Sequence, residues 1–462
     1  MSGKTYRFVL ILAFLALCLV GCRADRAPQN LAWPEVSLTA QDRILILAPH
    51  PDDETLACGG IIQQAVALGL PVRVAFLTYG DANEWSFALY RERPVLGSTA
   101  VEGMGLVRHG EAISATHTLG LQPDQLTFLG YPDFGTLDIW YAHWSASPPF
   151  RGLLTRVTAV PYADALRPGA LYKGEEILAD LTMVLREFRP TKVFLSHPAD
   201  GNPDHLALYL FTHVALWDLG AELQPTLYPY LVHYAHWPTP RGYHPTDPLP
   251  PPPGLEQTNA WQVHPLSAEE TGRKFTALQA HRTQYESNAA YLSSFVRRNE
   301  LFGDFPVIEL GASMPLVSDG IANPGPSEEL AATERVAFAG VEWRTVQLDG
   351  PDLVIALDYS RPLAQGVKAS VYIFGYRAGQ PFAGMPKLHV QFGEGSHVIY
   401  DQQRELPQDA LQVDRQPKQV TIHVPLALLG NPQRVMINAR TYLSDVPLDL
   451  ASWRILELAT SP

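Results

Sequence analysis

The apolar run RILILAP, residues 43–49, constrains the possible folds of this sequence more than any other feature. It has the length of a strand and no polar alternation, which is typical of a parallel strand covered on both faces. A helical pattern follows over residues 55–69. Between the two stand the ionisable residues His50, Asp52, Asp53 and Glu54. Because buried charges are costly without partners, this cluster predicts mutual pairing, a bound metal or a cleft.

Strand-like runs alternate with helical patterns through the first two thirds of the sequence. The further runs are VRVAFLTYG, LTFLGY, KVFLSH and LYPYLVHYA, and helical periods separate them. Such alternation predicts βαβ units and therefore an α/β fold, with a mostly parallel sheet and helices on both faces. In an open sheet of this kind, ligands bind just outside the carboxyl ends of the strands.

Shifts in composition predict two domains. Residues 41–312 carry the α/β pattern, and residues 313–333 are rich in Gly, Pro and Ser, as expected of a linker. Residues 334–462 consist of short alternating runs separated by turn residues. This texture predicts a C-terminal all-β sandwich.

Aromatic residues of the second domain allow two interpretations. If exposed, they could stack on sugar rings, and the domain would bind carbohydrate. If buried, they belong to the core of the sandwich, which is where most strand aromatics lie and which we favour. The residues concerned are Trp343, Tyr372, Phe374 and Tyr376.

Residues 1–21 are predicted to be a signal peptide rather than part of the fold. Lys4 and Arg7 flank the start of FVLILAFLALCLVG, an apolar stretch too short for a comfortable membrane span. The following LVGC resembles the lipobox of bacterial lipoproteins, in which the cysteine, here Cys22, is lipidated and becomes the first mature residue. Residues 22–40 would then tether the domains to a membrane of the bacterial cell envelope, outside the cytoplasm. The alternative is an uncleaved N-terminal anchor.

Charge and cysteine content exclude some classes of function. The formal net charge is -13 and no Lys/Arg run is present, which argues against binding the phosphate backbone of nucleic acid. Of the three cysteines, Cys18 and Cys22 lie in the signal segment and lipobox, which leaves Cys58. The sequence therefore predicts neither a disulfide framework nor a cysteine zinc site.

A second cluster of polar residues stands in an equivalent place. SHPADGNPDHLALY, residues 196–209, also follows a strand and opens a helix. It contains His197, Asp200, Asp204 and His205. Two clusters at the same edge of a sheet can meet, and imidazole plus carboxylate with an open position is the ligand set of a catalytic zinc site. The alternative is that these residues cap helices and satisfy backbone groups.

PHPDDE (49–54) and NPDHLAL (202–208) resemble the paired motifs of the PIG-L/LmbE-like de-N-acetylase family. LTYGD, RHGEAISATHTLG and FLGYPDFG resemble its intermediate blocks, so that the resemblance covers about residues 43–300. It implies a Rossmann-like domain that holds zinc, with another divalent metal as the alternative. It also implies removal of an acetyl group from N-acetylglucosamine attached to inositol or to other groups, which is hydrolysis of a linear amide.

The resemblance implies roles for individual residues. His50, Asp53 and His205 would be the zinc ligands. Asp52 would be the general base that acts on the zinc-bound water. Asp204 would orient a ligand or help to position Asp52.

Two further residues are implied to lie near the substrate. Arg108 and Asp133 would approach substrate hydroxyls or an anionic substituent. The alternative for Arg108 is a solvated helix charge paired with Glu111.

The sequence departs from the family pattern at Asn202, where the family usually has a histidine that assists the oxyanion or protonates the leaving amine. Asparagine can donate a hydrogen bond to an oxyanion but cannot deliver a proton at neutral pH. Either His197 supplies the imidazole, or the mechanism relies on the metal and Asp52, or catalysis has been lost.

Together these features predict a zinc-dependent hydrolase that removes the N-acetyl or other N-acyl group of an amino-sugar conjugate. The alternative is a surface-tethered, glycan-binding lipoprotein with a degenerate deacetylase domain. The presence of all three implied ligands and of the implied base, Asp52, favours the enzyme. Asn202 is the point in favour of the alternative.

Replacing Cys22 tests the predicted anchor. We expect Cys22→Ser to leave the membrane fraction or to be mislocalised, because the acyl chains that hold a lipoprotein cannot be attached to serine. Fractionation of cells followed by immunoblotting measures the distribution. An unchanged distribution would identify residues 1–21 as a plain anchor.

Overall fold

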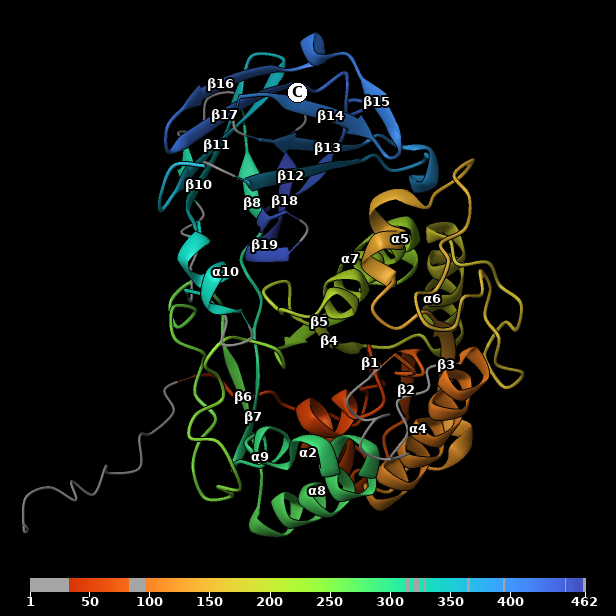
Figure 1. Cartoon of the computed structure of the whole chain (residues 1–462). Helices are drawn as coiled ribbons and strands as arrows, with labels where there is room; N and C mark the ends of the chain where they lie inside the picture. Colours follow the sequence, from red (N-terminus) through yellow and green to blue (C-terminus); the bar gives the residue numbers. More distant parts are fainter. Residues whose placement is uncertain are drawn as a thin grey trace, which may run out of the picture. The chain divides into compact units, whose positions relative to one another are not determined.

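A computed structural model describes most of the protein after residue 32 (Figure 1). The described residues are 33–82, 97–311, 316–318, 325–326, 330–363, 366–393, 395–444 and 446–459. The predicted signal peptide, Cys22 and most of the predicted linker lie outside them. Among the helices of the described part, none is long and apolar enough to cross a membrane.

A five-stranded parallel sheet forms the centre of the first domain, in the order β3-β2-β1-β4-β5. This confirms the predicted parallel sheet. Strands β2 and β3 follow β1 on one side of it, and β4 and β5 follow on the other side. The strand order therefore reverses between β1 and β4. The strands are β1 (Ile44–Ala48), β2 (Val72–Thr78), β3 (Leu126–Tyr131), β4 (Lys192–Ser196) and β5 (Thr226–Tyr230).

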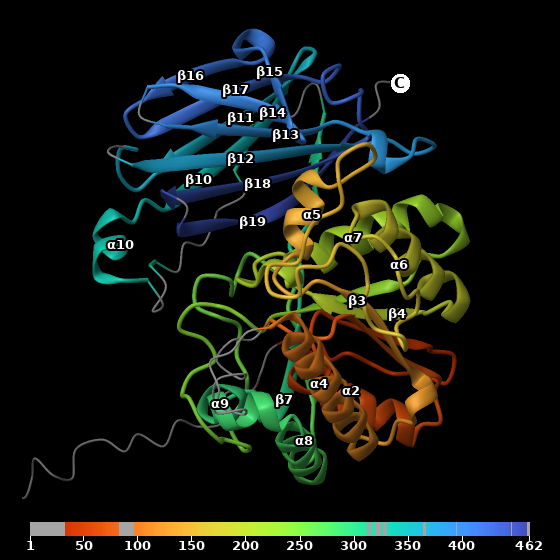
Figure 2. The same ribbon diagram turned by 45° about the vertical axis from the view of Figure 1, so that its right-hand side comes forward.

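Helices cover both faces of this sheet, as predicted (Figure 2). On one side α8 packs against both α2 and α4, and on the other α7 packs against α5 and α6. Both faces of β1 are therefore covered, and all of its residues are buried. The helices are α2 (Asp53–Ala67), α4 (Ser98–Thr118), α5 (Thr136–Ala142), α6 (Gly174–Phe188), α7 (Pro203–Leu219), α8 (Ala268–Ala280) and α9 (Arg282–Ser293). Strands β6 (Gln262–Pro265) and β7 (Asn299–Phe302) form a separate antiparallel pair.

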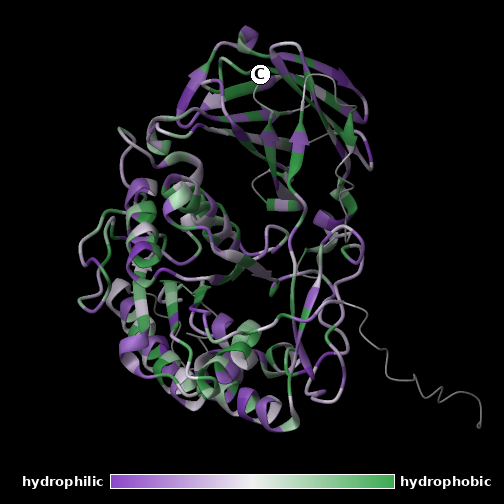
Figure 3. Ribbon diagram, turned by 180° about the vertical axis from the view of Figure 1, so that it is seen from behind, coloured by the Kyte–Doolittle hydropathy of each residue, from purple (hydrophilic) through white to green (hydrophobic). Residues whose placement is uncertain are grey.

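Two β-sheets make up the C-terminal domain, which confirms the predicted sandwich. Hydrophobic residues are interspersed with hydrophilic ones along these strands (Figure 3), and the inward-facing ones form a core that includes Ile355, Ile373 and Ile437. One sheet contains β9 (Val317–Ser318), β10 (Val341–Asp349), β11 (Asp352–Tyr359), β16 (Gln412–Gln416) and β17 (Gln419–Pro425). The other contains β8 (Ile308–Leu310), β12 (Val367–Tyr376), β13 (Lys387–Phe392), β14 (His397–Asp401), β15 (Arg404–Leu406), β18 (Arg434–Leu443) and β19 (Val446–Leu458). A short helix, α10 (Ala332–Ala337), precedes β10.

Strand β8 belongs to the sandwich although it precedes the predicted linker. Its residues pair in parallel with residues 456–458 of β19. Strand β9 lies within the predicted linker, residues 313–333, and pairs with β10. Strands on both sides of this segment, and one within it, therefore belong to the sandwich.

The aromatic residues of β12 face the first domain. Val371 and Ile373 point into the sandwich core, so Tyr372 and Phe374, one position along, point out of it. There Phe374 stacks on Trp140 of α5, with ring centroids 5.6 Å apart. The interpretation as sandwich core is therefore wrong for these two residues, which are buried between domains.

The remaining two aromatic candidates differ from each other. Tyr376 is also buried and donates a hydrogen bond to Asp218 of α7 at 2.9 Å. Trp343 is 53% exposed. Of the four, only the side chain of Trp343 presents a large free surface on which a sugar ring could stack.

Candidate metal centre and catalytic cavity

The loop from β1 to α2 carries the first motif in a strained conformation. Asp52, at the N-terminus of α2, has a backbone φ of 139°, which residues other than glycine rarely adopt. Its backbone N–H donates to Glu54 Oε2 at 2.9 Å, and the other oxygen of Glu54 lies 3.0 Å from His281 Nε2. Glu54 and His281 are fully buried, so this pair fixes the backbone that presents Asp52.

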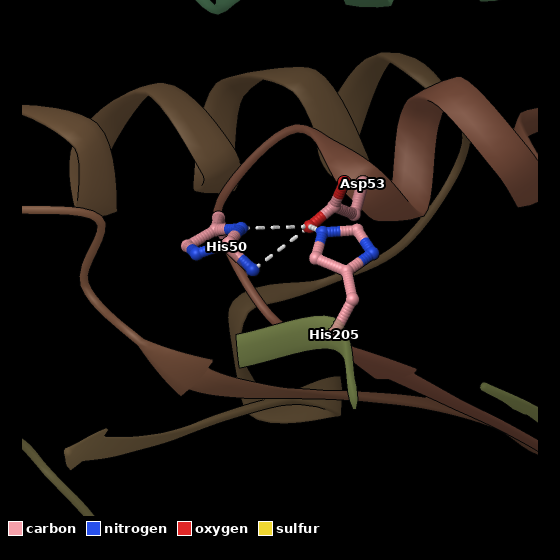
Figure 4. Close-up of side chains that lie close together, drawn as sticks. All are labelled: His50, Asp53 and His205. Atoms are coloured by element: carbon pink, nitrogen blue, oxygen red, sulfur yellow. Dashed lines mark hydrogen bonds and ion pairs between the residues drawn. The ribbon is translucent and has the colours of Figure 1, made fainter. Parts of the chain in front are cut away.

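Three buried side chains converge where β1 and β4 end (Figure 4). Asp53 Oδ2 lies 3.2 Å from His50 Nδ1 and 3.1 Å from His205 Nε2. His50 and Asp53 come from the β1–α2 loop, and His205 comes from the first turn of α7. The structure thus brings together the three residues that the resemblance implies as ligands.

The geometry of His205 fits a shared cation. Its Nε2 is buried and makes no hydrogen bond among the described residues, although Asp53 Oδ2 lies within 3.1 Å. An imidazole nitrogen and a carboxylate oxygen that meet without a hydrogen bond can both direct lone pairs at one ion. Two histidines and one aspartate also form a donor set suited to zinc and related divalent metals.

Two other groups of donors are less suited to a metal. They are Asp200 with His205 and His233, and His50 with Asp133 and Asp204. One oxygen of Asp200 accepts from the backbone N–H groups of Val232 and His233, at 2.9 and 3.0 Å. Asp204 accepts from Phe134 N at 2.6 Å and from Thr136 N at 3.1 Å. Because these carboxylates already serve as acceptors for neighbouring loops, we assign them to positioning the imidazoles.

Negative charge is in surplus around the three ligands. Burial alone would lower the pKa of His50, but Asp133, Asp204 and Asp53 raise it well above its usual range. Burial likewise opposes protonation of His205, yet Asp200 and Asp53 raise its pKa to about 9. Carboxylates that impose such shifts favour a bound cation for the same electrostatic reason.

Asp52 stands beside the three residues implied as ligands and is not part of that group. Burial raises the pKa of its carboxyl to about 7, although Arg108 opposes the rise. The residue lines the cavity described below. A carboxylate that faces substrate next to a metal centre can act as a general base.

Arg108, on α4, is buried against the β1–α2 loop. Its guanidinium donates to the backbone carbonyls of Gly80 and Pro51, at 2.7 and 2.8 Å, and lies 3.6 Å from Asp52 Oδ1. Glu111 instead accepts from Thr283. The interpretation of Arg108 as a solvated charge paired with Glu111 is therefore wrong.

Asp133 and Asp204 both hold His50 from the side opposite Asp53. Asp133 Oδ1 and Asp204 Oδ2 each lie 3.1 Å from His50 Nε2. Of the two roles considered for Asp204, orienting a ligand agrees with this position. Asp133 lines the cavity as well, where it can also approach substrate.

Asn202 caps helix α7. Its side-chain oxygen accepts a hydrogen bond from Asp204 N at 2.8 Å, as expected of an N-cap residue. His197 is fully buried, and the cavity-lining residues in the described part do not include it. Its Nδ1 accepts from Ala199 N, and its Nε2 lies 3.0 Å from the side-chain amide of Asn259. Both ring nitrogens thus face groups of the surrounding loops, which agrees with a bracing role for His197, and its role as a proton donor stays a prediction.

A cavity of about 1270 Å³ opens over these residues. Its lining includes His50, Asp52 and Asn202 of the two motifs, and also His233. No sequence pattern points to His233, because the run LYPYLVHYA predicts one continuous strand. Strand β5 in fact ends at Tyr230, so His233 follows a strand at the same edge of the sheet, which is the signal that could have revealed it.

His233 lies next to the ligand cluster. Its ring is 4.8 Å from that of His205, at an interplanar angle of 76°. Its backbone carbonyl accepts from Gly201 N at 2.6 Å, which ties the β5 loop to the loop of the second motif. His233 thus places an imidazole at the cavity wall, beside His205.

Comparison with known proteins agrees with this geometry. Residues 45–216 match the model of the PIG-L family, described as GlcNAc-PI de-N-acetylase. This segment is therefore similar to the PIG-L family. It includes β2 to β4, most of β1 and the whole of the candidate metal centre.

Two relatives are 1D-myo-inositol 2-acetamido-2-deoxy-alpha-D-glucopyranoside deacetylases. That of Saccharopolyspora erythraea is 33% identical over 187 residues, which are 39% of this chain and 55% of the relative. That of Rhodococcus jostii is 29% identical over 188 residues, which are 40% and 57%. The match thus spans little more than half the length of these relatives.

Among solved structures, the N,N'-diacetylchitobiose deacetylase of Pyrococcus horikoshii is similar to 56% of this chain, over 82% of its own length. The sequence identity is 19% and the TM-score is 0.34. A similarity of this size adds nothing to the family match.

Removing single ligands tests the metal centre. We expect His205→Ala and Asp53→Asn to lose most bound metal, because two remaining donors hold a divalent ion weakly. Elemental analysis of the purified protein after dialysis gives the metal content per molecule. The exposed His117, replaced by alanine, is the control for a lost imidazole. Equal metal content in His205→Ala and the wild type would contradict the assignment.

Proposed function

We propose that the protein is a metal-dependent deacetylase that hydrolyses the N-acetyl or N-acyl group of an amino-sugar conjugate. The observation that carries this proposal is the convergence of His50, Asp53 and His205, with Asp52 beside them facing a cavity. The match to the PIG-L family and the activity in the names of two relatives support the substrate class.

Zinc is the proposed metal, with another divalent metal as the alternative. His50, Asp53 and His205 would hold it, and Asp133, Asp200 and Asp204 would orient the two imidazoles. The ion supplies Lewis-acid activation of the acyl carbonyl and of water.

Asp52 is the proposed general base. It takes a proton from the attacking water and, once protonated, can return that proton to the leaving amine. The strained backbone at Asp52, held by Glu54 and His281, keeps the carboxylate directed into the cavity. The positive charge of the Arg108 guanidinium lies near the Asp52 carboxyl, which favours the ionised form of Asp52 between turnovers.

His233 is proposed to stabilise the acyl oxygen. As attack proceeds, negative charge develops on that oxygen, and a fixed N–H donor stabilises it. Asn202 is committed to the helix cap through its side-chain oxygen, and His197 is turned into the loop. The side-chain N–H2 of Asn202 can still donate into the cavity, which Asn202 and His233 both line, and His233 provides a second donor there.

The alternative of a degenerate, glycan-binding protein is not favoured. All four residues on which hydrolysis depends, the three ligands and Asp52, are present and close together. We also propose that the protein acts in the cell envelope, held at the membrane through Cys22. This localisation is supported by the basic residues Lys4 and Arg7, the apolar stretch that follows them and the LVGC motif.

Replacing each of the two neighbouring aspartates by asparagine separates their roles. We expect Asp52→Asn to keep its metal but to lose about 10²–10⁴ in kcat, since an amide cannot accept the proton of water. Asp53→Asn should instead lose the metal. Release of free amine from N-acetylglucosaminyl-inositol and related N-acetyl sugars measures the rate. The assignment fails if Asp52→Asn loses the metal while Asp53→Asn keeps it.

Replacing His233 tests its hydrogen bond to the acyl oxygen. His233→Ala should lower kcat by about 10²–10³ with metal content unchanged, which is the range for removal of one oxyanion donor. His233→Gln, which retains an N–H donor, should recover part of that loss. The same amine-release assay, with His117→Ala as the control, measures both. If His233→Ala stays within about threefold of the wild type, the residue has no such role.

A further inference from the structure

The sandwich domain forms one wall of the catalytic cavity. Arg440 on β18 and residues 446–449 and 452 on β19 line the same space as His50 and Asp52. These residues lie outside the match to the PIG-L family, which ends at residue 216. The shape of the cavity therefore depends on a part of the protein that the family comparison leaves unexplained.

This wall is held firmly against the first domain. Tyr141 of α5 stacks on Tyr372 of β12, with ring centroids 4.0 Å apart. Trp453 of β19 donates its backbone N–H to the carbonyl of Pro198, at 3.2 Å, in the loop of the second motif. The wall is thus fixed relative to the ligands rather than free to swing away.

Arg440 is the unusual residue of this wall. Its Nε is buried and has no hydrogen-bond partner among the described residues. Within the same part of the protein, no carboxylate oxygen lies within 4.0 Å of its guanidinium nitrogens. The exposed carboxylate of Asp138 lines the cavity but is outside that distance.

Tyrosines rather than acids surround Arg440. Its Cζ lies 5.8 Å from the centre of the Tyr442 ring, and Tyr141 and Tyr372 are also neighbours. Burial raises the pKa of the Tyr141 and Tyr372 hydroxyls above their usual range, so both are uncharged at neutral pH. Asp138 is near enough for its carboxylate to feel the charge of Arg440, but among the described residues no acid forms a close ion pair with this guanidinium.

The other cavity arginines are already engaged. Arg108 donates to two backbone carbonyls and approaches Asp52. Arg241 is exposed, lies 4.5 Å from the centre of the Tyr291 ring and donates to the carbonyl of Trp237. Among these arginines, Arg440 is thus the one best placed to bind an anionic group of a ligand.

We propose that Arg440 binds an anionic substituent, a carboxylate or a phosphate, of an N-acylated amino-sugar conjugate. The proposal rests on the proposed function, since it places the acyl group at the His50, Asp53 and His205 cluster. Guanidinium donors match both anions, and a bound anion supplies the close ion pair that no described acid forms with Arg440. The volume of about 1270 Å³ exceeds the roughly 300–1,000 Å³ common for small-molecule sites, which leaves room for such a substituent.

Binding of sugars to the full-length protein tests this inference without requiring hydrolysis. The probes are glucosamine, which has no anionic substituent, glucosamine 6-phosphate, which has a phosphate, and muramic acid, which has a carboxylate. We expect the wild type to bind at least one anionic probe about 10–100-fold more tightly than glucosamine, as one charge-assisted contact allows. Arg440→Gln should abolish this preference and leave the affinity for glucosamine within about threefold. Isothermal titration calorimetry measures the affinities.

Arg434→Gln is the matched control, because it removes an arginine from the same strand outside the cavity. It should keep the preference for the anionic probe. A preference that survives in Arg440→Gln, or its absence from the wild type, would overturn the inference. Hydrolysis of N-acetyl sugars by a wild type without any preference would leave the proposed function intact.

A measurement on the unmodified protein covers the case in which Arg440→Gln does not fold. Phenylglyoxal modifies accessible arginines, and peptide mass spectrometry reports the rate at Arg440. We expect glucosamine 6-phosphate or muramic acid to slow this modification at least about fivefold relative to glucosamine, in line with the occupancy of a bound site. Equal rates with all three probes would contradict binding at Arg440.

Discussion

Buried carboxylates that accept backbone hydrogen bonds hold together the edge of the sheet that carries the candidate site. Asp204, on α7, accepts from the loop after β3, and Asp200, in the loop after β4, accepts from the residues after β5. Glu54 does the same within the loop after β1. Loops that are distant in sequence are therefore tied to one another by the same groups whose charge a metal would offset. Loss of one such carboxylate would disturb both the geometry and the electrostatics of the site.

Much of this arrangement could be predicted from the sequence, because it follows from short patterns. The uninterrupted apolar run of β1 indicated a strand covered on both faces, and the polar residues after β1 and after β4 indicated one shared edge. The alternation of strands and helices then made a meeting of His50 with His205 an expectation. The structure adds that β1 and β4 are neighbours where the strand order reverses, which is why the two loops meet.

Other features depend on contacts that no local pattern encodes. His233 could not be predicted, because the apolar run of β5 continues beyond the end of the strand. Just after that end, Asp200 accepts hydrogen bonds from the backbone N–H groups of Val232 and His233. His281 stands between two helices, α8 and α9, and only the fold brings it to Glu54. The aromatic residues of β12 alternate as a sandwich strand should. Their outward face, however, is buried by α5, and the sequence of β12 contains no sign of that partner.

Strand β8 has a consequence for how the molecule is assembled. It directly follows the first domain in the sequence but pairs with β19, which comes after all other described strands of the sandwich, so the contact spans almost the entire sandwich. Contacts of such long range form slowly, because a large loop must close before they can form. During translation, the Rossmann-like sheet with its candidate metal centre can form before β8 pairs with β19. The wall that carries Arg440 would be completed only once β19 has paired, so the cavity would close after the candidate metal centre has formed.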